Sequence, residues 1–403
     1  MRAVCPPPWG RGTAAGGGGG CRPHINSINH NFRKEGLTVE NGISIYPGLD
    51  NSIEENLSLI EEAHKHGLTR LFTSLHIPET DPGRLKKELH ETLRAARDYG
   101  MEIISDISPA TLKLLGFREF KASAFKMLGI STLRLDYGFG LEEIAHLSRH
   151  SHGTRLQLNA STMTGKLLSA LIELKTDFNH IDALHNFYPR RGTGLSEETL
   201  VRKNLMLHKM GIRVGAFVPS STGRKRGPLG DGLPTMEEHR DEDTDLAARH
   251  LVALGTDSVF LSDSLPTPAE IASLGSLKGD QVTLSARLLT QDPLTRQLLQ
   301  ETFTARVDEA RDAIRAEESR KRLKELSPAS ATRLEAENTS ERPLGAVTLD
   351  NEGYGRYQGE LQIIKEPQGR DDRVNVVAQV EAEEIGLLQY ISPGRKFSFR
   401  FHD

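Results

Sequence analysis

The sequence predicts a (β/α)₈ barrel, of the α/β class, followed by a smaller β-rich domain. Eight short runs rich in β-branched residues recur along the chain, and a segment with helical periodicity lies between consecutive runs. Strand and helix alternating eight times is typical of such a barrel. The chain has 403 residues, more than the roughly 250 that one barrel needs, so we expect a second domain.

The predicted strands are short apolar runs, most of which end in a polar or ionisable residue. They span residues 43–48, 70–79, 102–109, 132–138, 155–162, 180–190, 213–220 and 257–264. The C-terminal strand ends and the loops after them form the active site of barrel enzymes. The polar strand ends therefore mark where the chemistry should lie.

The predicted helices carry start and stop signals. Asn51 or Ser52 can cap the start of the first, and Gly67 suits its end. Pro82 lies near the first turn of the second, and Gly100 follows its last turn. The helices are expected within residues 53–67, 81–100, 110–129, 141–153, 169–175, 196–211, 243–255 and 266–278. A long loop, residues 221–240, follows the seventh strand.

The chain changes character after residue 277. We expect a disordered tail over residues 1–40, the barrel over 41–277 and a compact β-rich domain over 278–403. In the last of these, residues 303–326 read as a charged amphipathic helix. Strand-like runs cover residues 281–289, 345–353, 354–364, 373–380 and 395–403.

Composition excludes several classes of protein. The formal net charge of −4 argues against general affinity for nucleic acid or anionic membranes. No apolar stretch reaches the length of about 18 residues that a membrane span needs. The two cysteines, Cys5 and Cys21, both precede the folded part, which suits a reducing, cytoplasmic compartment. The Pro/Gly-rich start lacks the apolar core of a signal peptide.

Three carboxylates follow neighbouring strands. Glu79, Asp106 and Asp136 come after the second, third and fourth predicted strands, so they should lie side by side on one rim. A local alternative is that Asp106 caps a turn and Asp263 caps the closing helix. The other strand-end candidates are Tyr46, Ser74, His76, Asn159, His185, Asn186, Arg190, Ser220 and Asp263.

The loop after the seventh strand predicts a phosphate site. It holds small residues, among them Ser220 and Ser221, and the basic run Arg224, Lys225 and Arg226. Barrel enzymes often bind phosphate near strands seven and eight through loop amides, and arginine suits a phosphate dianion. The alternative is a solvated, flexible lid.

Histidines elsewhere do not indicate a metal centre. The groups at 64–66 and 146–152 end predicted helices, on the face of the barrel that serves stability. No HExxH motif occurs, and the folded part has no cysteine. We therefore expect neither a metal nor a cofactor.

Several linked motifs resemble one known family. They are GISIYPG, LFTSLHIPE, SDISP, LRLDYGF, LNAST, HNFYPR, AFVPS with RGPL, GLPTMEEHR, VTLDN, YGRYQGELQI and RVNVV. From about residue 42 to the C-terminus, the chain resembles the 6-phospho-N-acetylmuramidase family. The resemblance implies a TIM barrel joined to a cyclophilin-like domain. It also implies hydrolysis of N-acetylmuramic acid 6-phosphate–N-acetylglucosamine, a phosphorylated amino-sugar disaccharide, in cytoplasmic peptidoglycan recycling.

The resemblance matches individual residues to family motifs, and our roles for them are hypotheses. The matches are Glu79, Asp106, Asp136, Asn159, His185, Asn186 and Arg190. A glycosidase needs a proton for the leaving oxygen and a carboxylate facing the sugar. We assign Asp106 and Glu79 to these tasks, in either order, and Asp136 to orienting a hydroxyl or tuning a neighbour. Arg190, Ser220, Ser221 and Arg226 are expected to recognise the phosphate.

The second domain is expected to pack on the catalytic mouth and to offer Tyr354 and Arg356 to the substrate. The alternative is that the tyrosines of the glycine-rich segment around these residues pack in the domain's own core.

Two rival functions remain open. One is a different phosphosugar enzyme, such as an aldolase or epimerase. A Schiff-base aldolase needs a lysine at a strand end, and none of the eight ends has one. The other is a non-catalytic phosphosugar-binding protein.

Overall fold

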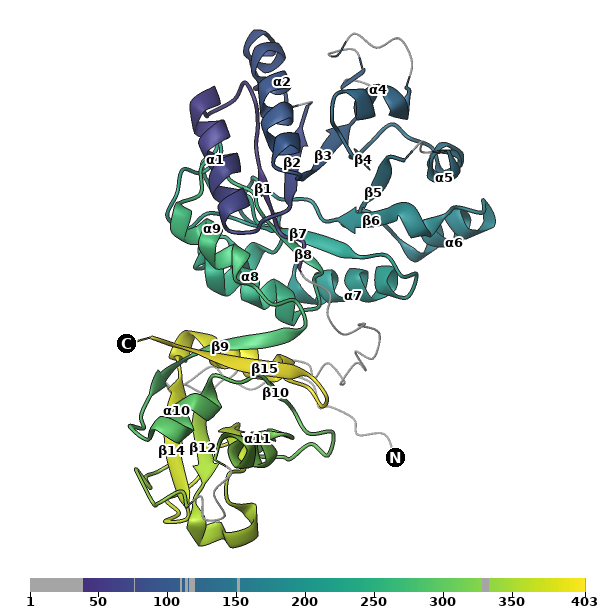
Figure 1. Cartoon of the computed structure of the whole chain (residues 1–403). Coiled ribbons are helices and arrows are strands. Elements are labelled where there is room, and N and C mark those ends of the chain that lie inside the picture. The colour runs from purple at the N-terminus through teal and green to yellow at the C-terminus, as the bar shows by residue number, and fades with distance from the viewer. Residues whose placement is uncertain are drawn as a thin grey trace, which may run out of the picture. The chain divides into compact units, whose positions relative to one another are not determined.

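The computed structural model describes residues 39–75, 77–108, 111–112, 115, 120–150, 153–327 and 333–402. They form a closed, eight-stranded parallel barrel with helices around it, and a second sheet of seven strands (Figure 1). The barrel closes because β1 pairs with β8 as well as with β2. The predicted barrel and the β-rich part after it are thereby confirmed.

Each predicted barrel run overlaps one strand, and β1 begins one residue before its run. The strands are β1 (Gly42–Ser44), β2 (Arg70–Ser74), β3 (Glu102–Ile107), β4 (Thr132–Leu135), β5 (Arg155–Asn159), β6 (Ile181–Leu184), β7 (Val214–Val218) and β8 (Ser258–Leu261). The helices are α1 (Ile53–Lys65), α2 (Pro82–Asp98), α4 (Ala122–Met127), α5 (Leu141–Arg149), α6 (Gly165–Glu173), α7 (Glu197–His208), α8 (Thr244–Ala253) and α9 (Pro268–Gly275), with short 3₁₀ turns η1 (Phe178–His180) and η2 (Glu237–His239).

The first two helices begin and end where local chemistry dictates. Ser52 and Glu55 form a capping box at α1, because each side chain accepts a hydrogen bond from the other's backbone amide. Asp81 accepts from two amides in the first turn of α2. Gly67 and Gly100 follow these helices with φ of 74° and 72°, a region that other residues avoid.

An ion-pair cluster lies inside the barrel at the N-terminal ends of the strands. Arg70 Nη2 lies 2.6 Å from Asp182 Oδ2, and Arg70 Nε lies 2.9 Å from Glu102 Oε2. Burial raises the pKa of Glu102, but the charge of Arg70 and the hydrogen bonds from Thr132 and Arg70 together outweigh it, and the pKa is lowered. Glu102 therefore stays ionised as a partner of Arg70.

Apolar side chains fill the next part of the interior. Phe72, Ile104 and Leu184 follow Arg70, Glu102 and Asp182 by two residues along their strands, so they point to the same side. They form one buried cluster, whose members are Tyr46, Phe72, Ile104, Leu184, Phe217, Leu233 and Phe260. The barrel is a packed core at this depth, and this apolar layer separates the ion-pair cluster from the polar side chains at the C-terminal strand ends.

The second sheet is mixed and curled. Its strands are β9 (Gln281–Leu288), β10 (Phe303–Thr304), β11 (Ala313–Arg315), β12 (Ala346–Asp350), β13 (Leu361–Ile364), β14 (Val374–Val380) and β15 (Lys396–His402), in the order β10-β15-β9-β14-β12-β13-β11. A bridge between Ala305 and Ala316 joins the two edges. The associated helices are α10 (Pro293–Leu299), α11 (Ser319–Leu326), η3 (Glu352–Tyr357) and η4 (Ala382–Tyr390).

The helix predicted over residues 303–326 is wrong for most of its length. This segment contains β10 and β11, and only α11 is helical. Phe303 and Ile314 are buried in the core of the second sheet, and β11 pairs with β13. Strand pairing and burial outweigh the helical preference of a charged segment.

Helix α8 joins the barrel to the second sheet within the compact unit Arg33–Asp403. Arg249 Nη1 lies 2.6 Å from Glu384 Oε2, and Arg400 Nη1 lies 2.8 Å from Asp245 Oδ1. His250 also approaches the hydroxyl of Tyr390, at 2.9 Å. These polar contacts fall on α8 and involve no residue that lines the barrel pocket described below, so the expected cover over the catalytic mouth gains no support from them.

In the described part of the chain, none of the helices combines the length and apolar character that crossing a bilayer requires.

Replacing Arg70 with alanine should lower the free energy of unfolding by about 3–5 kcal/mol, because it leaves buried carboxylates without their countercharge. Urea unfolding followed by circular dichroism measures the change. The matched control is Arg311→Ala, whose side chain is 91% exposed beside Asp312; it should change stability by less than about 0.5 kcal/mol. Equal effects of the two substitutions would contradict the role given to Arg70.

Candidate active site

A pocket of about 260 Å³ opens at the C-terminal ends of the barrel strands. Its lining comes from β2, β3, β4 and β7 and from the loops after β2, β4, β6 and β7. The residues are Phe72, Ser74, Ile77, Pro78, Glu79, Asp106, Arg134, Asp136, Asn186, Phe187, Phe217 and Arg226. The three predicted carboxylates thus line one pocket.

Arg134 connects the polar side chains of this pocket. It is 2% exposed, and its Nη1 lies 2.5 Å from Asp106 Oδ1 and 3.4 Å from Asp136 Oδ1. Its Nη2 donates to Asn186 Oδ1 at 2.6 Å. One buried guanidinium therefore fixes side chains that come from β3 and from the ends of β4 and β6.

Asp136 has a second partner on the next strand. Asn159, the last residue of β5, donates from Nδ2 to Asp136 Oδ1 at 3.1 Å. The Asn159 Oδ1 atom accepts from the amide of Ser161 at 3.1 Å. Asn159 is therefore a positioning residue for Asp136.

Three aromatic side chains also line the pocket. The rings of Phe72, Phe187 and Phe217 meet edge to face, with centroids 5.1–6.2 Å apart. Aromatic side chains of this kind offer an apolar surface that remains rigid. The pocket therefore suits a ligand with an apolar face and a polar edge, as a sugar ring has.

The guanidinium of Arg226 lies between two aromatic rings and has hydrogen-bond donors that no described residue accepts. Its guanidinium carbon lies 4.9 Å from the ring centroids of both Tyr46 and Phe187. The residue is 8% exposed, and its Nε and Nη1 atoms have no hydrogen-bond partner among the described residues. Because unmet buried donors are costly, this cation is suited to an anionic group of a ligand.

The amides predicted to cradle phosphate are already bound to a carboxylate of the protein. Glu270 accepts hydrogen bonds from the amides of Ser221 and Thr222 and from the hydroxyl of Ser220. Burial raises the pKa of Glu270, but these donors and the amide of Thr267 lower it to about 2. The side chain of Glu270 therefore takes the place that we expected phosphate to occupy.

Asp263 organises the same loop. Its two oxygens accept from the amides of Ser220 and Arg226, each at 2.9 Å. Burial raises the pKa of this carboxyl despite those bonds. Asp263 thus holds the backbone on either side of the loop and sets the position of Arg226, without lining the pocket itself.

His185 is a buried structural side chain in this arrangement. Its Nε2 lies 3.0 Å from Asn204 Oδ1, and its Nδ1 lies 3.1 Å from Ser161 Oγ. Burial, the largest cause, lowers the pKa of His185 to about 4. The imidazole is therefore neutral at physiological pH.

The remaining candidates divide by position. Tyr46 contacts the lining through Arg226, as described, and Arg190 is exposed outside the lining. Tyr354 and Arg356 belong to η3 in the second domain. His76 lies outside the described residues.

Arg134 was missed by the sequence analysis. It lies in β4 and precedes Asp136, the residue that directly follows this strand, by two residues, so an extended backbone would place the two side chains on one face. That spacing was the available signal, but we considered only the residues at strand ends. An arginine in the middle of an apolar strand indicates a buried carboxylate partner.

Among the described residues, no group of three or more histidine, cysteine, aspartate or glutamate side chains is placed to hold a metal ion.

Two family models match the chain. The model described as 6-phospho-N-acetylmuramidase, N-terminal, matches residues 41–276, and the corresponding C-terminal model matches residues 282–400. A crystal structure of an uncharacterised B. cereus protein is 29% identical, with 90% of this chain and 99% of that chain covered and a TM-score of 0.75.

A conserved Enterococcus faecalis protein of unknown function is 32% identical, with coverage of 90% and 96% and a TM-score of 0.63. The search of curated proteins found no match.

The buried, neutral His185 should make the protein lose stability in mild acid. Its folded pKa of about 4 lies below the ordinary 6.5, so the unfolded chain takes up the proton first. The contribution is complete above pH 6.5 and is lost as pH falls towards 4, by up to about 1.4 kcal/mol per pH unit. Urea unfolding between pH 7 and 4 should show a shallower pH dependence in His185→Gln. An unchanged dependence would show that the imidazole is not buried in its neutral form.

Proposed function

The chain belongs to the 6-phospho-N-acetylmuramidase family, a family of glycosidases, and from this premise we propose how it works. It hydrolyses the glycosidic bond of N-acetylmuramic acid 6-phosphate–N-acetylglucosamine and releases the phosphosugar and N-acetylglucosamine. The observation that carries the proposal is the pocket in which Glu79, Asp106 and Asp136 meet beside an unsatisfied arginine.

Asp106 is the carboxylate that faces the sugar carbon. Its ion pair with Arg134 favours the ionised form, which suits a nucleophile or a base and not an acid. It is also 6% exposed, so little water competes with a developing oxocarbenium charge. Removing its charge should therefore affect the chemical step.

Glu79 is the proton donor in this scheme. It lies in the loop after β2, lines the same pocket and makes no ion pair with a described residue. A carboxyl group free of cationic partners is the better candidate to hold a proton for the leaving oxygen. Asp136, held by Arg134 and Asn159, orients a hydroxyl of the sugar.

The pair Asp106 and Asp136 is the second candidate for the two catalytic groups. Their oxygens share Arg134 Nη1, so they are no more than about 6 Å apart, which is below the roughly 6.5–9.5 Å of inverting glycosidases. If this pair acts, the reaction retains the configuration at the anomeric carbon.

Arg226 recognises the 6-phosphate. It has unsatisfied donors, a fixed orientation between two rings and a place in the pocket lining. Arg190, Ser220 and Ser221, our other candidates, contribute less in this scheme, because Arg190 is outside the lining and both serines bind Glu270.

The proposal also covers the domain organisation of the chain and the cellular setting of the reaction. We divide the chain into a tail over residues 1–40, a catalytic barrel over 41–277 and a cyclophilin-like domain over 278–403. The reaction belongs to peptidoglycan recycling in the cytoplasm, where phosphorylated sugars are kept. The rival Schiff-base aldolase is disfavoured because no lysine is among the described residues that line the pocket.

Asp106→Asn should lower kcat on the phosphorylated disaccharide by about 10²–10⁴-fold, and Glu79→Gln by a similar factor. A substrate with an activated aryl leaving group separates the roles, because such a group leaves without protonation. It should restore turnover to Glu79→Gln and not to Asp106→Asn.

The matched control is Asp98→Asn, whose side chain is 64% exposed beside Arg97 and should keep wild-type kcat. Wild-type turnover in Asp106→Asn would remove this residue from the mechanism. Strong loss in Asp136→Asn, with full activity in Glu79→Gln, would favour the second carboxylate pair.

Arg226→Ala should reduce the preference for phosphorylated over unphosphorylated disaccharide, measured as a ratio of kcat/KM values, by about 10–100-fold for each lost ionic hydrogen bond. Arg226→Lys keeps the charge but loses the fork and should lie between the two. Arg224→Ala is the control in the same loop, because Arg224 binds Asn51 and Glu55 instead. An unchanged ratio in Arg226→Ala would place phosphate recognition elsewhere.

A further inference from the structure

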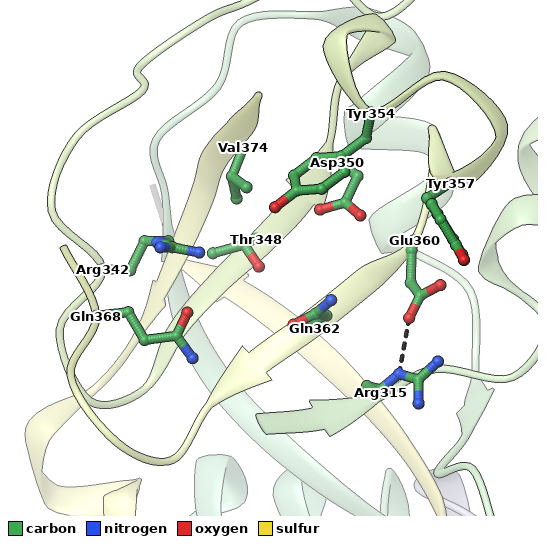
Figure 2. A pocket seen from close by; sticks show the side chains of 10 residues that line it. All are labelled: Arg315, Arg342, Thr348, Asp350, Tyr354, Tyr357, Glu360, Gln362, Gln368 and Val374. Carbon is green, nitrogen blue, oxygen red and sulfur yellow. Dashed lines mark hydrogen bonds and ion pairs between the residues drawn. The ribbon is translucent and has the colours of Figure 1, made fainter. Parts of the chain in front are cut away.

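The second sheet carries a pocket of its own, of about 290 Å³. Figure 2 shows its lining side chains gathered around one hollow, with the ion pair between Arg315 and Glu360 at one edge. The residues are Arg315, Arg342, Thr348, Asp350, Tyr354, Tyr357, Glu360, Gln362, Gln368 and Val374. None of them lines the barrel pocket.

Polar side chains are buried on the outer face of this sheet. Along β12, Val347 and Leu349 point into the hydrophobic core, and Thr348 and Asp350 alternate with them towards the pocket. Polar residues on an outer face are ordinarily solvated, yet Thr348 is 1% exposed and Asp350 is 6% exposed. The fold therefore shields a polar surface that has no part in the core.

The neighbouring strand follows the same pattern. Leu361 and Ile363 of β13 belong to the core, and Gln362 between them lines the pocket opposite Thr348, its cross-strand partner. Glu360 is 4% exposed and is paired with Arg315 at 2.7 Å. Carboxylates, amides and a hydroxyl thus converge on one hollow.

Asp350 is a buried acidic side chain of this lining. No described residue donates a hydrogen bond to its carboxylate, and it lines the pocket while more than nine-tenths buried. Burial, followed by the charges of Glu360 and Asp371, raises the pKa of Asp350 to about 7. Such a group is costly in the empty protein and becomes satisfied when a ligand donates to it.

The other lining residues define the ligand. The charges balance, since Arg315 and Arg342 face Asp350 and Glu360, so neither an anion nor a cation is favoured. Val374 is the one aliphatic residue of the lining, which disfavours an apolar ligand. Tyr354 and Tyr357 add aromatic rings, which sugars use as stacking surfaces. The volume is near the lower limit of about 300–1,000 Å³ for small-molecule sites, enough for one ring.

We propose that this pocket is a second sugar site, which binds one neutral, unphosphorylated N-acetylhexosamine ring through Asp350, Gln362 and the tyrosines of η3. The class of sugar rests on the proposed function, because N-acetylglucosamine is the neutral product of the barrel reaction. The pocket therefore responds to the product and not to the phosphorylated substrate.

Calorimetric titration of the full-length protein with N-acetylglucosamine tests the proposal. We expect saturable binding that Asp350→Asn and Gln362→Ala each weaken at least tenfold. Arg226→Ala should leave this binding unchanged, because it alters only the barrel pocket. The control Asp372→Asn is nearby, and its side chain is 78% exposed outside the lining; it should bind as the wild type does.

The outcomes are separable from those of the hydrolysis experiments. Sugar binding that survives in an inactive Asp106→Asn protein supports the second site whatever the mechanism in the barrel. No binding, binding lost in Arg226→Ala, or equal binding in Asp350→Asn would overturn the proposal. Tighter binding of inorganic phosphate than of the sugar at this pocket would also overturn it.

Thermal unfolding guards against a folding defect. If Asp350 were a structural residue, Asp350→Asn would lower Tm. If Asp350 serves to bind a ligand, its unpaired charge should instead destabilise the ligand-free protein. Asp350→Asn should then raise Tm at pH 8, where the carboxylate is ionised, more than at pH 5. A lowered Tm at both pH values would assign Asp350 to the fold.

Discussion

The barrel site depends on one buried cation. Arg134 lies in the interior with its guanidinium against the carboxylates of Asp106 and Asp136 and the amide oxygen of Asn186. Without this arginine, two carboxylates so close together would repel each other, and the charge of one would oppose ionisation of the other. The arginine places a positive charge beside both carboxylates, and it fixes side chains from β3 and from the ends of β4 and β6 at once. The apolar layer beneath keeps this cluster at the strand ends.

A similar arrangement appears at the opposite end of the strands, with a different result. Arg70 also pairs with two buried carboxylates, Asp182 and Glu102, but a packed layer of aromatic and aliphatic side chains separates this cluster from the pocket. Its charges act on the fold alone. The two arginines make the same type of ion pair, but only the cluster of Arg134 lines a pocket that a ligand could enter.

The sequence was sufficient for the barrel and for its rim. Each strand carries its own apolar signal, and a barrel fixes which strand ends are neighbours, so Asp106, Asp136 and Glu79 could be brought together in advance. Contacts between segments that are distant in the sequence could not be predicted in this way. Glu270 reaches the loop amides from a helix some fifty residues away, and the pairing of β11 with β13 overrides a locally helical pattern. Interactions of this kind depend on how the helices and strands pack together, which the periodicity of the sequence does not reveal.

Glu270 gives the loop after β7 a shape that needs no ligand. Its carboxylate is an internal anion that binds amides which would otherwise be free to bind an anion from solution. With a pKa of about 2, it stays charged across the physiological range, so the loop is held in the same form in mild acid and at neutrality. The substrate then meets a surface that is already ordered, and little conformational entropy is lost on binding. In the proposed scheme, recognition of the phosphate rests on the single guanidinium of Arg226 and not on these amides, so one substitution would be enough to change the anion selectivity of the site.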